Sequence, residues 1–177
     1  MAIYSSRFEP VALSELSITE KLFEGLAGDP NRVVLTEGMT GRTVTAGQLD
    51  DGIRRLAGGL AARGQGKGTV TAVMAPNIPE YVTVFHGVAF AGGTVTTINP
   101  TYTAEEVRHQ LQDAGATLLV TIPQFLETAR EAIQDTEVSE IAVIGGADGA
   151  LSLDALLGEP LDAQVPVSPA EDVAVLP

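Results

Sequence analysis

The sequence contains no cysteine and no tryptophan, and only two of its 177 residues are histidine. Without cysteine there is no disulfide, no thiolate metal site and no cysteine nucleophile. The two histidines, His86 and His109, are too few for a histidine-rich zinc site. A cysteine nucleophile and a thiolate metal site are therefore excluded, and a histidine-rich zinc site is not expected in this chain.

Basic residues are scarce as well. Lys and Arg number 10 against 23 Asp and Glu, which gives a formal net charge of −13. The only lysines are Lys21 and Lys67, and the only adjacent basic pair is Arg54-Arg55. Binding a nucleic acid requires clustered basic side chains. We therefore expect no nucleic-acid partner, and we interpret the acidic surface as a solvated one.

Long hydrophobic runs are also missing. No segment approaches the roughly 20 consecutive apolar residues that span a membrane. The first residues, MAIYSSRFEPVALSEL, lack the basic start and apolar run of a signal peptide. We expect no membrane partner and a cytoplasmic location. The hydrophobic content of 45% is nonetheless enough for a domain with a substantial core.

The first half of the chain carries strong local signals. Thr45 and Gln48 have the spacing of a capping box, in which each side chain bonds to the other residue's backbone amide. Apolar residues follow at helical spacing: Leu49, Ile53, Leu56, Ala57 and Leu60. Gly64 ends the predicted helix. Before it, segments Arg32–Leu35 and Arg42–Val44 flank the turn TEGMTG and predict a hairpin, preceded by a short helix at Thr19–Leu26.

Strands and helices alternate beyond Gly64. We predict strands at Val70–Met74, Thr94–Ile98, Thr117–Ile122 and Glu140–Ile144, with helices at Pro79–Ala91, Ala104–Ala114 and Gln124–Gln134. Several strands lack polar alternation, which is typical of strands that are covered on both faces. The alternation predicts right-handed crossovers. The expected fold class is therefore α/β, with a doubly wound, mostly parallel sheet flanked by helices.

The chain divides into three expected segments: an irregular N-terminal segment 1–30, an α/β core 31–145, and a linker with the start of another strand at 146–177. Within the last, Leu151–Leu157 is expected to form one or two helical turns, and Glu159–Pro169 an extended linker. Ala170–Pro177 resembles the beginning of a buried strand. We therefore expect a truncated domain whose apolar sheet edge makes the isolated chain aggregate or depend on its missing portion.

Motifs that could carry chemistry are few. No GxxxxGK[ST] or GxGxxG is present, and Gly64-Gln-Gly-Lys-Gly68 follows a helix, the wrong order for a phosphate site at a helix start. We interpret it as a turn. The acidic pair at Glu105 and Glu106 is explained by a capping box with Thr103. No catalytic residue and no metal-binding residue is predicted in this chain.

Two helices contain the histidines. The helix at Pro79–Ala91 is apolar almost all round, which predicts a buried helix. His86 lies within it and has no carboxylate on the same face, so we expect a histidine at the edge of the core. In the helix at Ala104–Ala114, Arg108 and His109 are expected to face solvent, whereas Val107 and Leu111 point inward.

Several stretches, in order, resemble adenylate-forming enzymes. Arg42-Thr-Val-Thr-Ala-Gly-Gln-Leu49, with the helix to Gly64, is similar to a first conserved block of that superfamily. Met74-Ala-Pro-Asn-Ile-Pro-Glu-Tyr81 resembles its PNxPE element. Gly87–Gly93 and Thr97–Glu106 resemble a second block, whose NPxYTxxE form is typical of 4-coumarate–CoA ligases and related luciferases. Tyr4–Phe8 and Leu16–Ile18 also fit. The chain is identified as the N-terminal part of a 4-coumarate–CoA ligase-like acyl-CoA synthetase.

That resemblance implies an N-terminal subdomain that stops before the Ser/Thr/Gly-rich phosphate loop. The parent enzyme would use ATP and Mg²⁺ to convert a small carboxylic acid, of the aryl or cinnamate type, into an acyl-adenylate, and would then transfer the acyl group to CoA. The fragment alone would be inactive. Its implied partner is the remainder of the same enzyme, which cleavage at the phosphate loop would leave as a separate chain.

The resemblance also places Asn99, Pro100, Thr101 and Tyr102 at the border of the CoA entrance. The residues by themselves predict only a sharp turn before a helix, because the residue before proline avoids helical geometry. Two other functions stay open: a stand-alone module that binds a nucleotide or CoA without catalysis, and an interaction domain. The acid also stays open between a cinnamate, a benzoate and a fatty acid.

Overall fold

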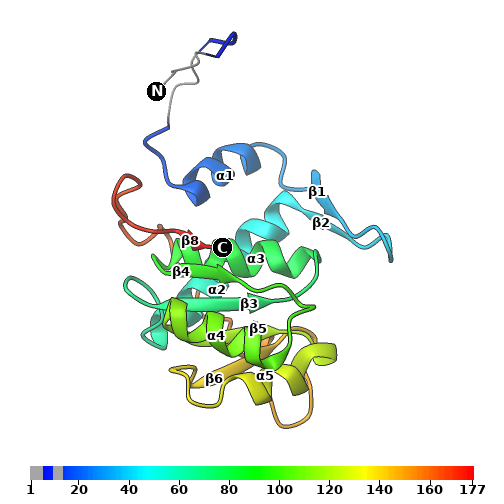
Figure 1. The fold of residues 1–177 in the computed structure, drawn as a ribbon. Helices are drawn as coiled ribbons and strands as arrows, with labels where there is room; N and C mark the ends of the chain where they lie inside the picture. Colours follow the sequence, from blue (N-terminus) through cyan, green and yellow to red (C-terminus); the bar gives the residue numbers. More distant parts are fainter. Residues whose placement is uncertain (1–5, 10–13) are drawn as a thin grey trace.

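The computed structural model describes residues 6–9 and 14–177, and Figure 1 shows their arrangement. Tyr4 and Ser5, which contribute to the family resemblance, lie outside the described residues. The first elements are helix α1 (Ile18–Leu26), the antiparallel hairpin of β1 (Val33–Thr36) and β2 (Thr43–Thr45), and helix α2 (Ala46–Ala62). The predicted short helix and hairpin are therefore confirmed.

The expected capping box starts helix α2. The Thr45 hydroxyl accepts a hydrogen bond from the Gln48 amide at 3.3 Å, and the Gln48 side chain accepts one from the Thr45 amide at 2.9 Å. Helix α1 begins in the same way at Ser17 and Glu20. Gly64 has a φ of 73°, a left-handed conformation that favours glycine, and the chain leaves α2 at that residue.

A six-stranded sheet forms the centre of the molecule, in the order β7-β6-β5-β3-β4-β8. Every neighbouring pair in it is parallel, as predicted. The strands are β3 (Val70–Met74), β4 (Thr94–Thr97), β5 (Ala116–Thr121), β6 (Glu140–Val143), β7 (Leu151–Ser152) and β8 (Val175–Leu176).

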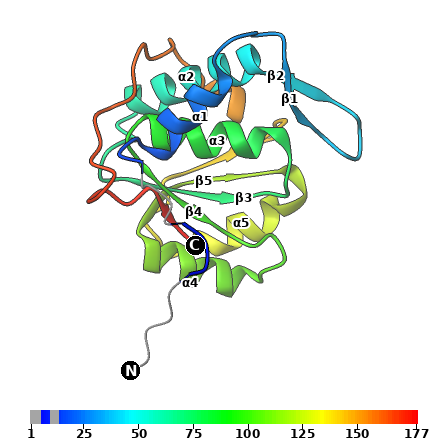
Figure 2. The ribbon, with the colours of Figure 1, turned by 90° about the horizontal axis from the view of Figure 1, so that it is seen from above.

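The direction of each crossover determines which face its helix covers. Helix α3 (Pro79–Phe90) carries the chain from β3 to β4, and α4 (Ala104–Ala114) carries it back past β3 to β5. Right-handed crossovers in opposite directions place their helices on opposite faces. Figure 2 shows this result: α1, α2 and α3 lie on one face of the sheet, and α4 lies on the other with α5 (Leu126–Ala132).

Two apolar cores result, one on each side of the sheet. The larger lies under α2 and α3, with fully buried side chains such as Ile53, Leu56 and Val84. The smaller lies under α4 and α5 and includes Val107 and Leu111. No residue of α3 is exposed, which agrees with a helix that is apolar on most of its circumference. Within the described ranges 6–9 and 14–177, no helix is both long enough and apolar enough to cross a bilayer.

The connection from β7 to β8 returns across the α2–α3 face. Gly158 donates its amide to the carbonyl of Arg55 at 2.9 Å, and Val165 donates to the carbonyl of Phe90 at 2.9 Å. The first contact brings two backbones unusually close. A Cβ on Gly59 would lie 1.5 Å from the carbonyl oxygen of Leu156, so only glycine fits there.

Four predictions of local structure are corrected. Leu151–Leu157 is not simply helical, because its first two residues pair with β6 and only Leu153–Leu156 forms a 3-10 turn, η2. The segment Gln124–Gln134 begins with a 3-10 turn, η1 (Pro123–Phe125), before α5.

The other two corrections concern exposure. The strand expected to be buried, β8, lies at the sheet edge, where the Val175 side chain is 37% exposed. The sequence predicts that Arg108 faces solvent beside His109. His109 does, but Arg108 is half-buried because its guanidinium reaches across to α5 and donates to the carbonyl of Glu131 at 2.7 Å.

Candidate functional site

The sheet reverses its winding between β3 and β5. From β3 the chain passes through α3 to β4 on one side, and from β5 it passes through α5 to β6 on the other. In open parallel sheets, the crevice at the carboxyl ends of two such strands is the usual ligand position. That crevice is bordered by the loop 75–78 after β3 and by Ile122 after β5, whereas the loop 98–103, which contains the four predicted site residues, follows β4 on the other side of β3.

The four predicted residues form one turn. The Asn99 side-chain oxygen accepts hydrogen bonds from the Thr101 amide at 3.0 Å and from the Thr101 hydroxyl at 2.9 Å. The Tyr102 amide donates to the Asn99 carbonyl at 3.1 Å. Asparagine first and Pro100 second is a favoured arrangement in such turns. The architectural interpretation of this stretch, a sharp turn before a helix, is therefore confirmed.

The turn ends in a capped helix. Thr103 and Glu106 form the predicted capping box, with the Glu106 carboxylate 2.8 Å from the Thr103 amide that donates to it. That backbone hydrogen bond, followed by one from the Thr103 hydroxyl, holds the pKa of Glu106 below its usual value. The rim of α4 beside the turn thus carries a carboxylate that stays ionised.

Tyr102 lies at the head of a shallow groove of about 530 Å³ along α4. Tyr102 is 40% exposed, and Asn99 and Thr101 are exposed too, whereas Pro100 is half-buried. The other lining residues are mostly acidic or polar: Glu105, Glu106, His109, Gln110 and Asp113. This groove repels anionic groups, so phosphates are disfavoured in it, whereas a neutral ligand is not.

Two residues that the sequence does not single out anchor the base of the turn. The Gln110 amide nitrogen donates to the Thr96 hydroxyl at 2.9 Å and to the Thr97 carbonyl at 3.0 Å. From α3, the Tyr81 hydroxyl lies near Thr97; burial raises the pKa of Tyr81, and the interaction with Thr97 partly offsets the rise. A signal for Gln110 does exist, since it follows the inward-facing Val107 by three residues on the same helix face.

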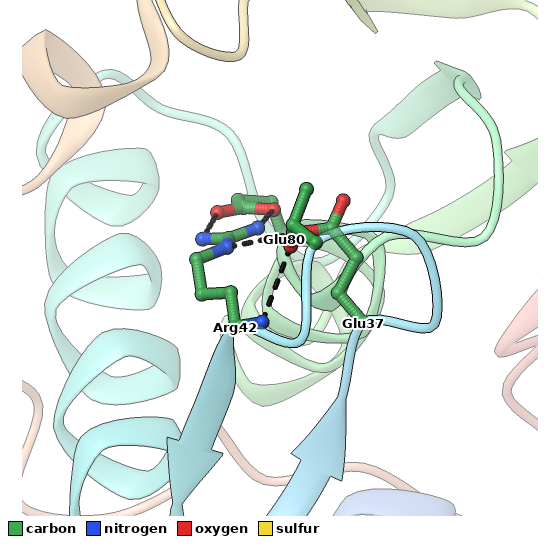
Figure 3. A network of polar contacts seen from close by, with 4 residues as sticks. Glu37, Arg42 and Glu80 are labelled. Atoms are coloured by element: carbon green, nitrogen blue, oxygen red, sulfur yellow. Dashed lines mark hydrogen bonds and ion pairs between the residues drawn. The ribbon is translucent and has the colours of Figure 1, made fainter.

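An ionic network connects the hairpin to the start of α3, directly after the loop 75–78 (Figure 3). The guanidinium of Arg42, on the hairpin, forms a two-pronged contact with the carboxylate of Glu80 in the first turn of α3, with one prong of 2.8 Å. Its Nε also donates to Glu37 at 3.2 Å. The hairpin is thereby held against a cavity of about 260 Å³ that Asn77 and Tyr81 help to line.

Each member of this network stabilises the charge of the others. The hydrogen bond from Arg42 lowers the pKa of Glu80, and hydrogen bonds from Thr40 and then Arg42 lower that of Glu37. The pKa of Arg42 is raised, mainly by Glu80. The cluster is therefore fully ionised at neutral pH and is a structural clamp with no proton to exchange.

His86 lies away from this crevice, on the half of α3 beyond the middle of the helix. Its Nδ1 is 3.1 Å from the hydroxyl of Thr19, which is completely buried at the start of α1. Burial lowers the pKa of His86 to about 4, so the ring is neutral near pH 7. The expectation of a histidine at the edge of the core is confirmed, with a partner on another helix.

The described residues do not fit the phosphates of ATP or a magnesium ion. In 6–9 and 14–177 no three acidic or histidine side chains gather as a metal site would require. The basic side chains from Lys21 to Arg130 already bond to carboxylates or backbone carbonyls: these are Lys21, Arg32, Arg42, Arg54, Arg55, Arg63, Lys67, Arg108 and Arg130. Gly64–Gly68 forms the expected turn, closed by a hydrogen bond from the Gly66 amide to the Thr69 hydroxyl.

Comparisons with known proteins agree with one another. The model of the family "AMP-binding enzyme" matches residues 22–177. The 4-coumarate–CoA ligase 3 of Oryza sativa subsp. japonica is 34% identical over 179 residues, covering 100% of this chain and 32% of the rice protein. The 4-coumarate–CoA ligase 5 of the same plant is 31% identical and is likewise covered to 32%. The chain thus spans about a third of the length of these relatives.

Solved structures show the same fold. A long-chain-fatty-acid–CoA ligase from Archaeoglobus fulgidus superposes with a TM-score of 0.85 at 24% identity, over 97% of this chain and 36% of the other. A benzoate–CoA ligase from Burkholderia xenovorans does so with a TM-score of 0.79 at 17% identity, over 89% and 31%. At these identities the likeness concerns the fold alone.

Proposed function

The chain belongs to the AMP-binding enzyme family, and on that premise we propose that it forms the N-terminal part of an ATP-dependent acid–CoA ligase. The family resemblance read from the sequence motifs is thereby confirmed. The observation that carries the proposal is the 34% identity to a rice 4-coumarate–CoA ligase over the whole chain. That relative extends well beyond the match, so the activity proposed is that of the longer protein.

The proposed reaction has two steps. A carboxylate oxygen of the acid attacks the α-phosphate of ATP, which forms an acyl-adenylate and releases pyrophosphate. The thiol of CoA then attacks the acyl carbon, which forms the thioester and releases AMP. Mg²⁺ would neutralise phosphate charge. Because the described residues fit neither phosphates nor Mg²⁺, we assign both to the remainder of the enzyme, and we propose that this chain alone is inactive.

The part that this chain contributes is a framework for the CoA side. We propose that the turn of Asn99, Pro100, Thr101 and Tyr102 borders the path of CoA. Its place at the carboxyl end of β4, beside the loop after β3, and the exposure of Tyr102 support this role. The carboxylates along α4 favour contact with the neutral pantetheine arm, because they repel the phosphates at the other end of CoA.

The acid is proposed to be of the aryl or cinnamate type, by analogy with the names of the relatives. Structures of similar fold bear the names of anthranilate, benzoate and long-chain-fatty-acid ligases. A panel of cinnamates, benzoates and fatty acids therefore belongs in any assay. The remainder of the enzyme as partner and the cytoplasmic location stay predictions.

Pyrophosphate exchange tests this function. We would compare the chain alone, a chimera in which it replaces the matched third of rice 4-coumarate–CoA ligase 3, and the rice remainder alone. The chimera is expected to exchange pyrophosphate into ATP in the presence of an accepted acid, whereas both controls stay at background. Exchange by the chain alone, or micromolar ATP binding to it in calorimetry, would contradict the proposal and favour a stand-alone nucleotide-binding module.

A further inference from the structure

One hydrogen-bonded side chain encloses the whole turn that borders the proposed path of CoA. Gln110 lies on α4, about two helical turns after the N-cap residue Thr103. Its amide nitrogen donates to the Thr97 carbonyl at 3.0 Å, a contact between residues 13 positions apart. The chain from Thr97 to Gln110 is thereby closed into a ring that contains the turn of residues 99–102. Such a closed loop restricts the conformations that are open to every residue inside it.

The partners of the Gln110 amide determine how it is turned. A carbonyl oxygen such as that of Thr97 can only accept, so the NH₂ end of the amide faces it. The same nitrogen donates its second proton to the Thr96 hydroxyl at 2.9 Å. Both protons are therefore used at the end of β4, and only one orientation of the amide satisfies both partners. Gln110 thus holds two successive residues of the strand in one arrangement.

Burial makes this contact difficult to replace. Thr96 is 1% exposed, and Gln110 is half-buried between α4 and the sheet. A buried hydroxyl that loses its partner still bears the cost of its removal from water, so the strand end would shift to find another partner. From the opposite face of the sheet, Tyr81 of α3 lies near Thr97. The end of β4 is therefore held from both helical layers, and Gln110 provides the contact with α4.

The bonds within the turn do a different task. The side chain and the carbonyl of Asn99 accept hydrogen bonds from the next residues, and these bonds set the shape of the turn. They connect the turn only to itself, so they do not fix its direction from the sheet. Its far end is joined to α4 by the capping box of Thr103 and Glu106. Gln110 ties α4 back to β4, which gives the exposed Tyr102 a fixed place.

We propose that Gln110 is a positioning residue for the CoA step: it holds the turn of residues 99–102 in the path of CoA and leaves adenylate formation unaffected. The inference rests on the proposed function. Gln110 acts through the turn and does not touch the reacting atoms. A misplacement of about 1 Å in a positioning group can cost a factor of about 100 in rate. A loosened turn that keeps its internal bonds is expected to cost less, about tenfold in the KM for CoA.

Gln110→Met tests this role, because methionine is similarly long and unbranched but has no proton to donate. The experiment uses the rice chimera. Pyrophosphate exchange without CoA measures the first step, and thioester formation at varied CoA concentration measures the second. Gln110→Met is expected to raise the KM for CoA about tenfold, whereas pyrophosphate exchange and the KM for ATP stay within about twofold of the unsubstituted chimera. A residue with a purely structural role would change all of these together.

The matched control is Gln112→Met. Gln112 lies on the same helix and also donates to a backbone carbonyl, that of Asp135 at 2.9 Å, away from the turn. Its replacement is expected to leave the KM for CoA unchanged.

Thr96→Val probes the same contact from the other partner. Valine has nearly the shape of threonine and lacks the hydroxyl that accepts from Gln110. It is expected to raise the KM for CoA about threefold, since one of the two hydrogen bonds is lost. Combined with Gln110→Met it is expected to add nothing further, because the two changes remove the same hydrogen bond.

Each outcome decides the inference. An active chimera whose KM for CoA is unchanged by Gln110→Met overturns it and leaves the proposed function standing, and so does an equal rise in Gln112→Met. If Gln110→Met lowers both steps in parallel, Thr96→Val decides: a selective rise in the KM for CoA supports the inference, and any other result overturns it. An unsubstituted chimera that exchanges no pyrophosphate contradicts the proposed function, and the role of Gln110 falls with it.

Discussion

At the scale of single residues, the pairing of His86 with Thr19 connects α3 to α1 through a neutral imidazole. The folded state disfavours the protonated ring, because burial lowers its pKa from the ordinary 6.5 to about 4. The unfolded chain therefore binds the proton more tightly between these two values. Stability from this source is complete above pH 6.5 and is lost as the pH falls toward 4.

The replacement His86→Gln is predicted to flatten this pH dependence. Between pH 7 and pH 5 the free energy of unfolding of the wild type is expected to fall by about 1 kcal/mol more than that of the variant, after allowance for partial exposure of the ring. The carboxylates with lowered pKa values titrate below this window, so they do not mask the difference. Urea unfolding at both pH values measures it; parallel losses in the two proteins would contradict the assignment.

The ion pair between Arg42 and Glu80 is predicted to contribute little to the free energy of unfolding, despite its two-pronged geometry. Both groups lie at the surface, where water screens the attraction. A double-mutant cycle with Arg42→Ala and Glu80→Ala is expected to give a coupling of about 0.5–1 kcal/mol that shrinks in high salt. The exposed pair Lys21–Glu24 is the matched control and should couple close to zero. A coupling energy of similar size in the two cycles would show that the two-pronged geometry adds no stability.

At the scale of elements, helix starts can be predicted from the sequence because the groups that form them are neighbours. The capping boxes at Thr45 and Thr103 follow from spacing alone. The third, at Ser17 and Glu20, has the same spacing and could have been found as well. Contacts between distant segments have no such local signal. Arg108 reaches a carbonyl 23 positions away, and nothing in its own helix predicts that partner.

The two adjacent glycines of α2 illustrate the same limit. Glycine lowers helix stability in solvent, so Gly→Ala in a helix usually helps by up to about 1 kcal/mol. At Gly59, however, a Cβ would lie 1.5 Å from the Leu156 carbonyl oxygen. We predict that Gly59→Ala destabilises the fold by about 2–4 kcal/mol, because rigid backbone must move.

Gly25→Ala in α1 is the control, since no other group lies within 4 Å of the position that its added methyl would take. It is expected to be neutral or stabilising by about 0.5 kcal/mol. Thermal unfolding of the two variants beside the wild type measures the contrast. If Gly59→Ala unfolded at the same temperature as Gly25→Ala, the close approach of segment 156–159 to α2 would be wrong.

At the scale of the whole molecule, the layer arrangement can be predicted because strand and helix patterns alternate along the chain. The order of strands cannot, since it depends on which way each crossover turns. The candidate site is predictable in part for the same reason. The turn at Asn99 and Pro100 is local, whereas its anchors Tyr81 and Gln110 meet Thr97 only after the sheet and both helices have assembled.

The exposed edge predicts how the isolated chain behaves in solution. At concentrations where light scattering is sensitive, we expect the wild-type chain to associate through β8, as the sequence suggests for an uncovered edge. Val175→Lys places a charge on that edge and is expected to restore the monomer, whereas Met39→Lys on the hairpin tip is not. A wild-type chain that stays monomeric throughout the same concentration series would contradict this expectation.

The pairing of β8 with β4 also imposes a delay during biosynthesis, because β8 is made long after β4. Val95 pairs with Val175, 80 positions later in the chain. At about 5–20 residues per second, a ribosome needs roughly 4–16 s to make that stretch. Throughout this interval β4 has no neighbour on its outer side, although β3 already covers the inner one. In crowded polysomes, mispairing between nascent chains is therefore expected first at β4 and not at the opposite edge, where β7 follows β6 after only a few residues.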